Sequence, residues 1–237
     1  PEFDSFARTA AFAAHPNGVI VRPGAEAAAR EAGSMVAGCD DLAEAACRVW
    51  EDLCVLEAED PAEGPYRLTA AAVGFPTDWQ LPEKMGQPLM AIHEPIHGYA
   101  EQLSKGVDHF FRTLKAGEIY GRSNWFVVAN DALRYLPRDD PAQRFAHVTE
   151  RNAGESLFLR CERQTLRRLP QTGAVLFTIG IAVEPLGKVS VVLLDRIARA
   201  VTDLGEGEHA RRAAPHYAGA LMAYATRRAR EQMGRAA

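Results

Sequence analysis

The sequence of 237 residues contains no apolar run long enough to cross a membrane as a helix. Near its first residues it also lacks a basic segment followed by an apolar one, which is the pattern of a secretory signal. We therefore expect a soluble, cytoplasmic protein that does not bind a membrane.

Cysteine is scarce, and the four residues are Cys39, Cys47, Cys54 and Cys161. No two of them stand in a CxxC spacing, which argues against a zinc site or a redox dithiol and leaves free thiols as the expectation. Basic residues are not in excess either, since 27 Lys and Arg against 31 Asp and Glu give a net charge of -4. A surface that binds nucleic acid is therefore disfavoured.

Apolar residues are abundant by contrast, at 47% of the chain, which is enough to bury a sizeable core. We expect the α+β class, in a single domain with helical extensions. The expected parts are an N-terminal arm at residues 1–40, a main domain at 41–205 and a C-terminal helical extension at 206–237.

Hydrophobic periodicity predicts the main elements. Apolar residues recur at helical spacing in four segments, residues 42–56, 100–114, 186–204 and 215–235. Extended structure is predicted in three segments, residues 66–74, 120–128 and 174–181. Residues 53–57 also fit a strand paired with 66–74, so the end of the first helix stays open. The irregular stretch 129–155 is long enough to form a lid or a partner surface.

Arginines cluster just before the apolar run at 174–181. If residues 159–169 form a helix, Arg160, Arg163 and Arg167 share one face at i, i+3 and i+7. Guanidinium groups on a rigid element bind carboxylate or phosphate in a bidentate way, so a cofactor with two carboxylates would fit. For any single arginine, pairing with a surface acid is the alternative.

Four segments of the chain are distinctive, namely FPTDWQLPEKMGQPLMAIHEPIHGY, VDHFFRTLKAG, RSNW and RCERQTLRRLPQTGAVLFTI. Together they resemble the haem-dependent oxidative N-demethylase family, whose characterised type is the α subunit of a dimethylamine monooxygenase. The resemblance runs from about Glu51 to Leu186. It implies a PAS-like fold, in which an antiparallel sheet flanked by helices binds haem b and its iron. It also implies that NADPH electrons arrive through partner proteins carrying FMN and 2Fe-2S.

The resemblance points to His93, in the IHxP run, as the axial ligand of the haem iron. His93 stands between the apolar residues Ile92 and Pro95, and imidazole is a common haem ligand. The alternatives that stay open are His97, His109 and Cys161.

Further site residues follow from the same resemblance. The haem propionates are expected to bind the arginines of the ERQTLRRLP run, namely Arg163, Arg167 and Arg168. The expected catalytic groups are Arg122, Asn124 and Gln164. Large aromatic residues are expected to wall the pocket, namely Trp79, Trp125 and Phe177.

The chain departs from the family at Gly180-Ile181-Ala182, where an Arg-Thr-Tyr-like set commonly follows FTI. A different substrate or a more apolar distal pocket is the expected consequence. We therefore expect a haem-dependent monooxygenase that acts with O2 on a small amine or other nitrogen-containing metabolite and takes electrons from a partner reductase. A haem-binding gas or redox sensor is the main alternative, and a haem-free protein that binds an organic acid is a weaker one.

Overall fold

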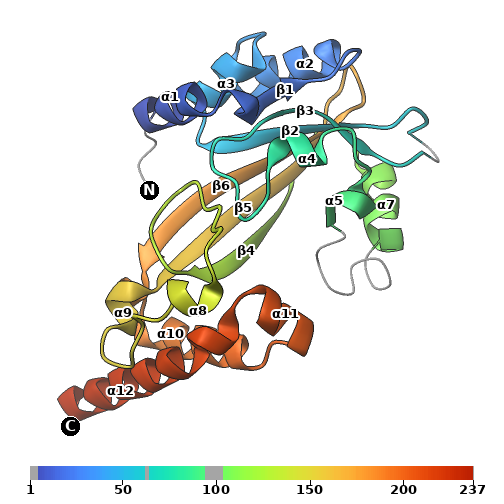
Figure 1. The fold of residues 1–237 in the computed structure, drawn as a ribbon. Coiled ribbons are helices and arrows are strands. Elements are labelled where there is room, and N and C mark those ends of the chain that lie inside the picture. The colour runs from blue at the N-terminus through green and yellow to red at the C-terminus, as the bar shows by residue number, and fades with distance from the viewer. Residues whose placement is uncertain (1–4, 62–63, 94–103, 237) are drawn as a thin grey trace. The chain divides into compact units, whose positions relative to one another are not determined.

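The computed structural model describes residues 5–61, 64–93 and 104–236. Its strands form one six-stranded antiparallel sheet in the order β1-β3-β2-β6-β5-β4, with helices packed against it (Figure 1). The strands are β1 (Val19–Val21), β2 (Glu51–Glu57), β3 (Arg67–Ala72), β4 (Tyr120–Val128), β5 (Phe158–Arg168) and β6 (Val175–Pro185). The predicted α+β class and antiparallel sheet are confirmed, whereas the PAS-like topology stays a prediction.

The described helices are α1 (Ser5–Ala14), α2 (Glu26–Ala37), α3 (Leu42–Arg48), α4 (Leu81–Lys84), α5 (Leu89–His93), α7 (Ser104–Thr113), α8 (Pro141–Arg144), α9 (Ala153–Ser156), α10 (Val191–Thr202), α11 (Glu206–Arg211) and α12 (Ala218–Ala236). Four of them, α3, α7, α10 and α12, overlap segments in which apolar periodicity predicts a helix, whereas the other helices were not predicted. Short 3-10 turns are η1 (Pro16–Gly18), η2 (Leu186–Lys188) and η3 (Ala214–His216). Within the described ranges, no helix combines the length and apolar character needed to span a membrane.

The prediction of a helix at residues 159–169 is wrong, because residues 158–168 form strand β5. Burial along β5 has a period of two, with Arg160, Glu162 and Gln164 all buried. Because these three residues are polar, a hydrophobicity pattern does not predict that they are buried. The turn that follows needs Gly173, whose φ of 74° is in the left-handed region.

The open question at residues 53–57 is settled in favour of the strand. Helix α3 begins after Asp41, whose side chain accepts a hydrogen bond from the Glu44 amide, and it ends at Arg48. β2 then pairs with β3 on one side and β6 on the other. Its five central residues are all buried, as expected of a strand covered on both faces.

Residues before 41, predicted as an arm, contain α1, β1 and α2. β1 pairs with β3 at Val19 and Ala72, and α2 contributes Ala28, Ala29 and Ala32 to a buried cluster. The boundaries at 40/41 and 205/206 stay predictions.

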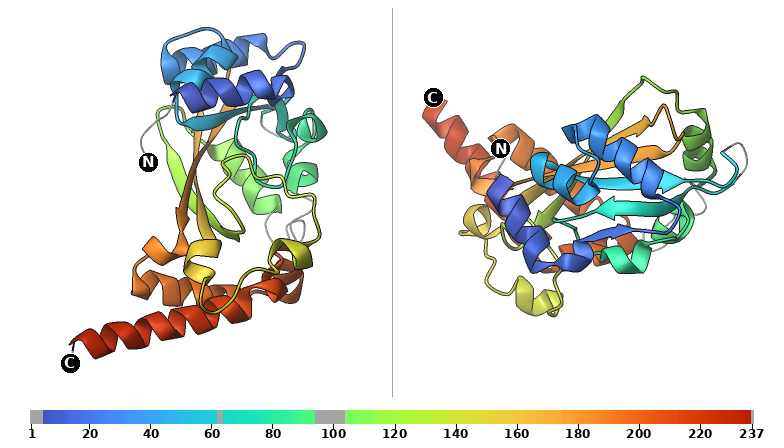
Figure 2. Two further views of the ribbon diagram at one scale, coloured as in Figure 1. Left: turned by 60° about the vertical axis from the view of Figure 1, so that its left-hand side comes forward. Right: turned by 90° about the horizontal axis from the view of Figure 1, so that it is seen from above.

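Contacts divide the chain into two compact units. The first unit comprises residues 1–124, 134–136 and 162–181. In it, α1, α2 and α3 lie together over one face of the sheet (Figure 2). The other face carries a second apolar cluster, which includes Leu81 of α4, Leu89 of α5 and Phe111 of α7.

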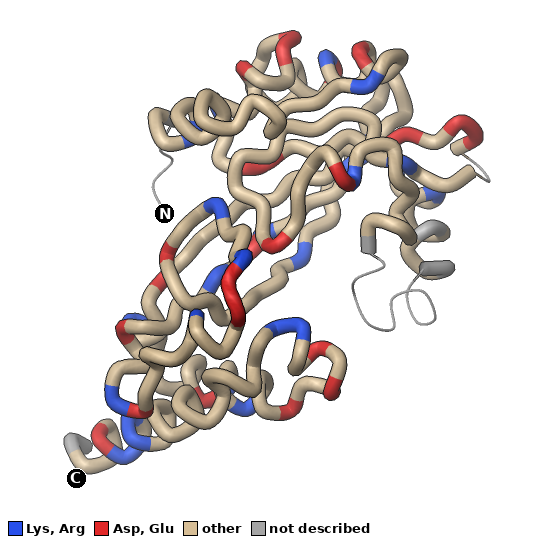
Figure 3. Tube along the Cα trace, in the orientation of Figure 1, with Lys and Arg blue, Asp and Glu red and all other residues tan. Residues whose placement is uncertain are grey.

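The second unit comprises residues 125–133, 137–161 and 182–237. Its core is formed largely by α10 and α12, with Leu194 and Leu221 fully buried. Acidic and basic residues are interspersed along the described chain (Figure 3), in agreement with the small net charge.

Candidate functional site

Four polar side chains of the first unit form one hydrogen-bonded row. Nε of Arg122 donates to Oε1 of Gln164 at 2.7 Å. Nε2 of Gln164 donates to Oε2 of Glu162 at 2.9 Å, and Oγ1 of Thr77 donates to Oε1 of Glu162 at 2.7 Å. Glu162 and Gln164 are each 7% exposed, whereas Arg122 is exposed. The row therefore runs from the protein interior to a cationic end at the surface.

An apolar surface lies on the same side of β5 as this row. Leu166, two residues after Gln164, and Phe177 of β6 both pack against the cluster formed with α4, α5 and α7. Other partly exposed members of this cluster are Trp79, Met85, Ile92, Val107 and Phe110. The sheet and these helices therefore place aromatic and aliphatic side chains beside a guanidinium group.

His93 is the last residue of α5, directly after Ile92 of this surface. Its side chain lies outside the part of the structure that is described, as does the whole of His97. The alternative ligand His109 is exposed on α7, and Cys161 is a half-buried cysteine of the second unit. The identity of the axial ligand stays a prediction.

The predicted propionate arginines do not form one cluster. Arg163 and Arg167 occupy odd positions of β5 and share the face of Thr165, whose hydroxyl bonds that of Thr178 at 2.7 Å. Gln164 and Leu166 point to the opposite face. The sequence prediction grouped the arginines at i, i+3 and i+7, a spacing that puts residues on one face of a helix but not on one face of a strand.

Arg168 is on the Gln164 side of β5, but its donors are used within the protein. Nε donates to Leu114 O at 2.7 Å and Nη1 to Gly173 O at 2.6 Å. Nη2 donates to Phe111 O and to the Tyr66 hydroxyl. This side chain joins the end of α7 to the β5–β6 turn.

The two remaining residues of the RSNW segment belong to different units. Asn124 is half-buried in the first unit, two residues after Arg122 in β4. Trp125 belongs to the second unit and packs against its core. There its carbonyl oxygen accepts a hydrogen bond from Nη1 of Arg212 at 2.8 Å, and the Arg212 guanidinium lies over its ring.

The departure at Gly180 is explained by a neighbouring aromatic ring. A Cβ atom at Gly180 would lie 2.7 Å from Cζ3 of Trp50, which is closer than van der Waals contact allows. The indole Nε1 of Trp50 also donates to Ile181 O at 3.1 Å. Trp50 thus occupies the space that a larger residue at position 180 needs. Ile181 is buried.

Sequence reasoning missed Thr77 and Glu162. The available signal was the alternation Arg160, Glu162, Gln164, which is a polar pattern of period two inside a segment read as a helix. Thr77 gave no signal, because it contacts Glu162 only through the fold.

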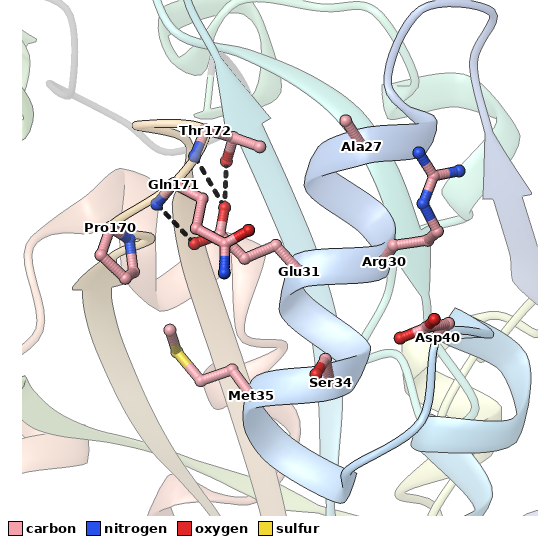
Figure 4. A pocket seen from close by; sticks show the side chains of 9 residues that line it. All are labelled: Ala27, Arg30, Glu31, Ser34, Met35, Asp40, Pro170, Gln171 and Thr172. Atoms are coloured by element: carbon pink, nitrogen blue, oxygen red, sulfur yellow. Dashed lines mark hydrogen bonds between the residues drawn. The ribbon is translucent and has the colours of Figure 1, made fainter.

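A cavity of about 440 Å³ lies elsewhere in the first unit, between α2 and the turn after β5 (Figure 4). Glu31 lies beside it and accepts hydrogen bonds from the amides of Gln171 and Thr172 and from the Thr172 hydroxyl. Burial opposes ionisation of Glu31, but these hydrogen bonds hold its pKa below the usual value. None of the predicted site residues lines this cavity, and Glu31 serves to fix the turn.

Comparison with known families identifies a match that covers most of the chain. A family model described as "Haem-dependent oxidative N-demethylase, alpha subunit-like" matches residues 37–222.

Proposed function

We propose, since this chain belongs to the haem-dependent oxidative N-demethylase alpha subunit-like family, that it binds haem b and oxidises a small amine or other nitrogen-containing metabolite. The observation that supports this most directly is the apolar surface beside Arg122 and Gln164 in the first unit. Bound haem supplies the capacity to activate O2, which no side chain has.

The side chains of this surface suit a porphyrin, which has two broad apolar faces and two carboxylates at one edge. Trp79, Phe110 and Phe177 offer partly exposed rings, against which a flat apolar group can pack. The terminal nitrogens of the Arg122 guanidinium can bind one of the carboxylates. His93 directly follows Ile92, which belongs to this surface. We assign the axial ligand to His93 and the carboxylate contact to Arg122.

This assignment moves the carboxylate contact away from the three arginines that the sequence suggested. Arg163 and Arg167 lie on the opposite face of β5 from Gln164, and the donors of Arg168 are engaged by backbone carbonyls and Tyr66. Arg122 has its Nε bound to Gln164, which leaves the outer edge of its guanidinium for a ligand.

The polar groups proposed to face the substrate are Asn124 and Gln164. The buried Ile181 supplies no hydrogen-bond donor from its side chain where the family commonly has a polar residue. A pocket with few donors favours a small, weakly polar amine over one that must be held by several hydrogen bonds. Electrons would come from NADPH through a partner reductase with FMN and 2Fe-2S, as expected of an alpha-type subunit.

Family membership favours an enzyme over the haem sensor, and one measurement separates the two. Oxidative demethylation of an N-methyl amine consumes O2, two electrons and two protons, and yields the shortened amine, formaldehyde and water. An enzyme therefore consumes reductant faster when amine is added and releases formaldehyde in step. A sensor shows neither response.

Absorption spectra of the purified protein, oxidised and reduced, test haem binding and the ligand together. We expect a haem spectrum in the wild type that is lost or strongly shifted in His93→Ala. The exposed His147 provides the matched control, and His147→Ala should leave the spectrum unchanged. An unaltered spectrum in His93→Ala would refute the ligand assignment and direct attention to His97, His109 and Cys161. A wild type that binds no haem would refute the function.

A further inference from the structure

Glu162 is a buried carboxylate with both oxygens engaged. Oε1 accepts from the Thr77 hydroxyl at 2.7 Å and Oε2 accepts from Nε2 of Gln164 at 2.9 Å. Family resemblance did not point to Glu162 or Thr77, so their role has to be inferred from these contacts.

The contact with Glu162 fixes which way the Gln164 amide faces. An ionised carboxylate only accepts hydrogen bonds, so Gln164 must turn its NH2 group towards Glu162. The amide oxygen then points in the other direction, where Nε of Arg122 donates to it at 2.7 Å. With the amide reversed, two donors would face each other at Arg122 and two acceptors at Glu162.

The consequence for Arg122 is a fixed guanidinium plane. Gln164 binds only Nε, and within the described residues the terminal nitrogens of Arg122 have no hydrogen bond or ion pair. These nitrogens form the edge that binds a carboxylate with two parallel hydrogen bonds. An arginine held in this way loses less conformational entropy on binding than a free surface arginine does.

We propose that Glu162, acting through Gln164, is the positioning residue that holds Arg122 ready to bind a carboxylate. Thr77 in turn orients Glu162. The carboxylate belongs either to the haem, in which case the inference rests on the proposed function, or to a small organic acid. The two sources share one chemistry and are distinguished by experiment.

Titration of the apoprotein with haem and with haem dimethyl ester, which lacks the carboxylates, tests the first source. We expect Arg122→Ala to weaken haem binding by about tenfold or more and to leave ester binding unchanged. Glu162→Gln should weaken haem binding by about threefold to tenfold, since the Gln164 amide can then turn over. Arg138→Ala, an exposed arginine, is the control.

A polarity swap separates positioning from a merely structural role. In the double variant Glu162→Gln/Gln164→Glu, the new carboxylate accepts from both Arg122 and the amide at 162, while Thr77 still has an acceptor. We expect this variant to recover most of the haem affinity lost in Glu162→Gln. The unfolding midpoint of each variant shows whether it is folded.

The second source is tested with acetate and succinate, by the rise that each causes in the unfolding midpoint of the apoprotein. A rise that is lost in both Arg122→Ala and Glu162→Gln supports the inference with a small acid as ligand, even if the wild type binds no haem and the proposed function fails. The inference is overturned if Arg122→Ala and Glu162→Gln change neither the haem-to-ester ratio nor the response to acids. The inference is also overturned if the double variant Glu162→Gln/Gln164→Glu does not recover the haem affinity that Glu162→Gln loses.

Discussion

Arg8 and Asp52 form a buried ion pair, with Nη1 of Arg8 2.9 Å from Oδ1 of Asp52 and side chains only 2% and 1% exposed. The Asp52 carboxylate also accepts hydrogen bonds from the backbone amides of Gly74 and Phe75, at 2.9 and 3.1 Å. Arg8 donates further to the carbonyl oxygens of residues 46, 50 and 51. The pair therefore joins α1 to β2 and to the turn after β3.

Removing one partner of this pair leaves a charge buried without compensation. We expect Asp52→Asn or Arg8→Met to lower the free energy of unfolding by about 3–5 kcal/mol, measured by urea denaturation. The exposed pair of Arg48 and Glu44, with both side chains 52% exposed, is the comparison. Arg48→Met should cost under about 1 kcal/mol. Equal losses in both pairs would contradict the assigned role of burial.

Arg168 is expected to stabilise α7 rather than to bind a ligand. Its hydrogen bonds to Phe111 O, Leu114 O and Gly173 O satisfy carbonyls at the helix end and in the β5–β6 turn. In Arg168→Lys, one ammonium cannot reach all of them, so amide hydrogen exchange in α7 and the turn should accelerate. Arg112→Lys, on the exposed side of α7, is the control. Unchanged protection in Arg168→Lys would argue against this role.

Gly180 and Trp50 should show energetic coupling. The contact of 2.7 Å between a new Cβ and Cζ3 of Trp50 predicts that Gly180→Ala costs about 1–3 kcal/mol of unfolding free energy. In a Trp50→Ala background the same substitution should cost much less, because the obstructing ring is gone. A double-mutant cycle by urea denaturation measures this difference. Additive effects would show that Trp50 does not restrict position 180.

The acid stability of the second unit should depend on Glu208. Hydrogen bonds from Arg211, and then from Arg212, lower the pKa of Glu208 to about 2. A lowered pKa means that the folded state favours the carboxylate. The stabilisation is therefore complete above the usual value near 4.5 and is lost as the pH falls through about 2.

The corresponding experiment compares the wild type with Glu208→Gln in urea. The wild type should have the higher midpoint at pH 7, and its advantage should shrink at pH 3. Glu155→Gln, at an exposed position of α9, should show no such change. An advantage that stays constant between the two pH values would contradict the assigned pKa.

Elements whose buried residues are apolar could be predicted from the sequence. Helices α10 and α12 and strands β3 and β6 all follow apolar patterns of the expected period. β5 could not be predicted in this way, because Arg160, Glu162 and Gln164 are buried by virtue of partners distant in sequence. The polar partners Ala132 O, Thr77 and Arg122 become neighbours only after the chain has folded.

Family membership, matched over residues 37–222, and the α+β class could both be predicted from the sequence, because family motifs and the periods of apolar residues are patterns along the chain. Which arginine contacts Gln164 could not be predicted, because it depends on how the strands pair. Arg122 is 42 residues away along the chain and reaches Gln164 because β4 pairs with β5. Arg163 directly precedes Gln164 in β5 but points to the other face of the sheet, since successive side chains of a strand alternate between the two faces.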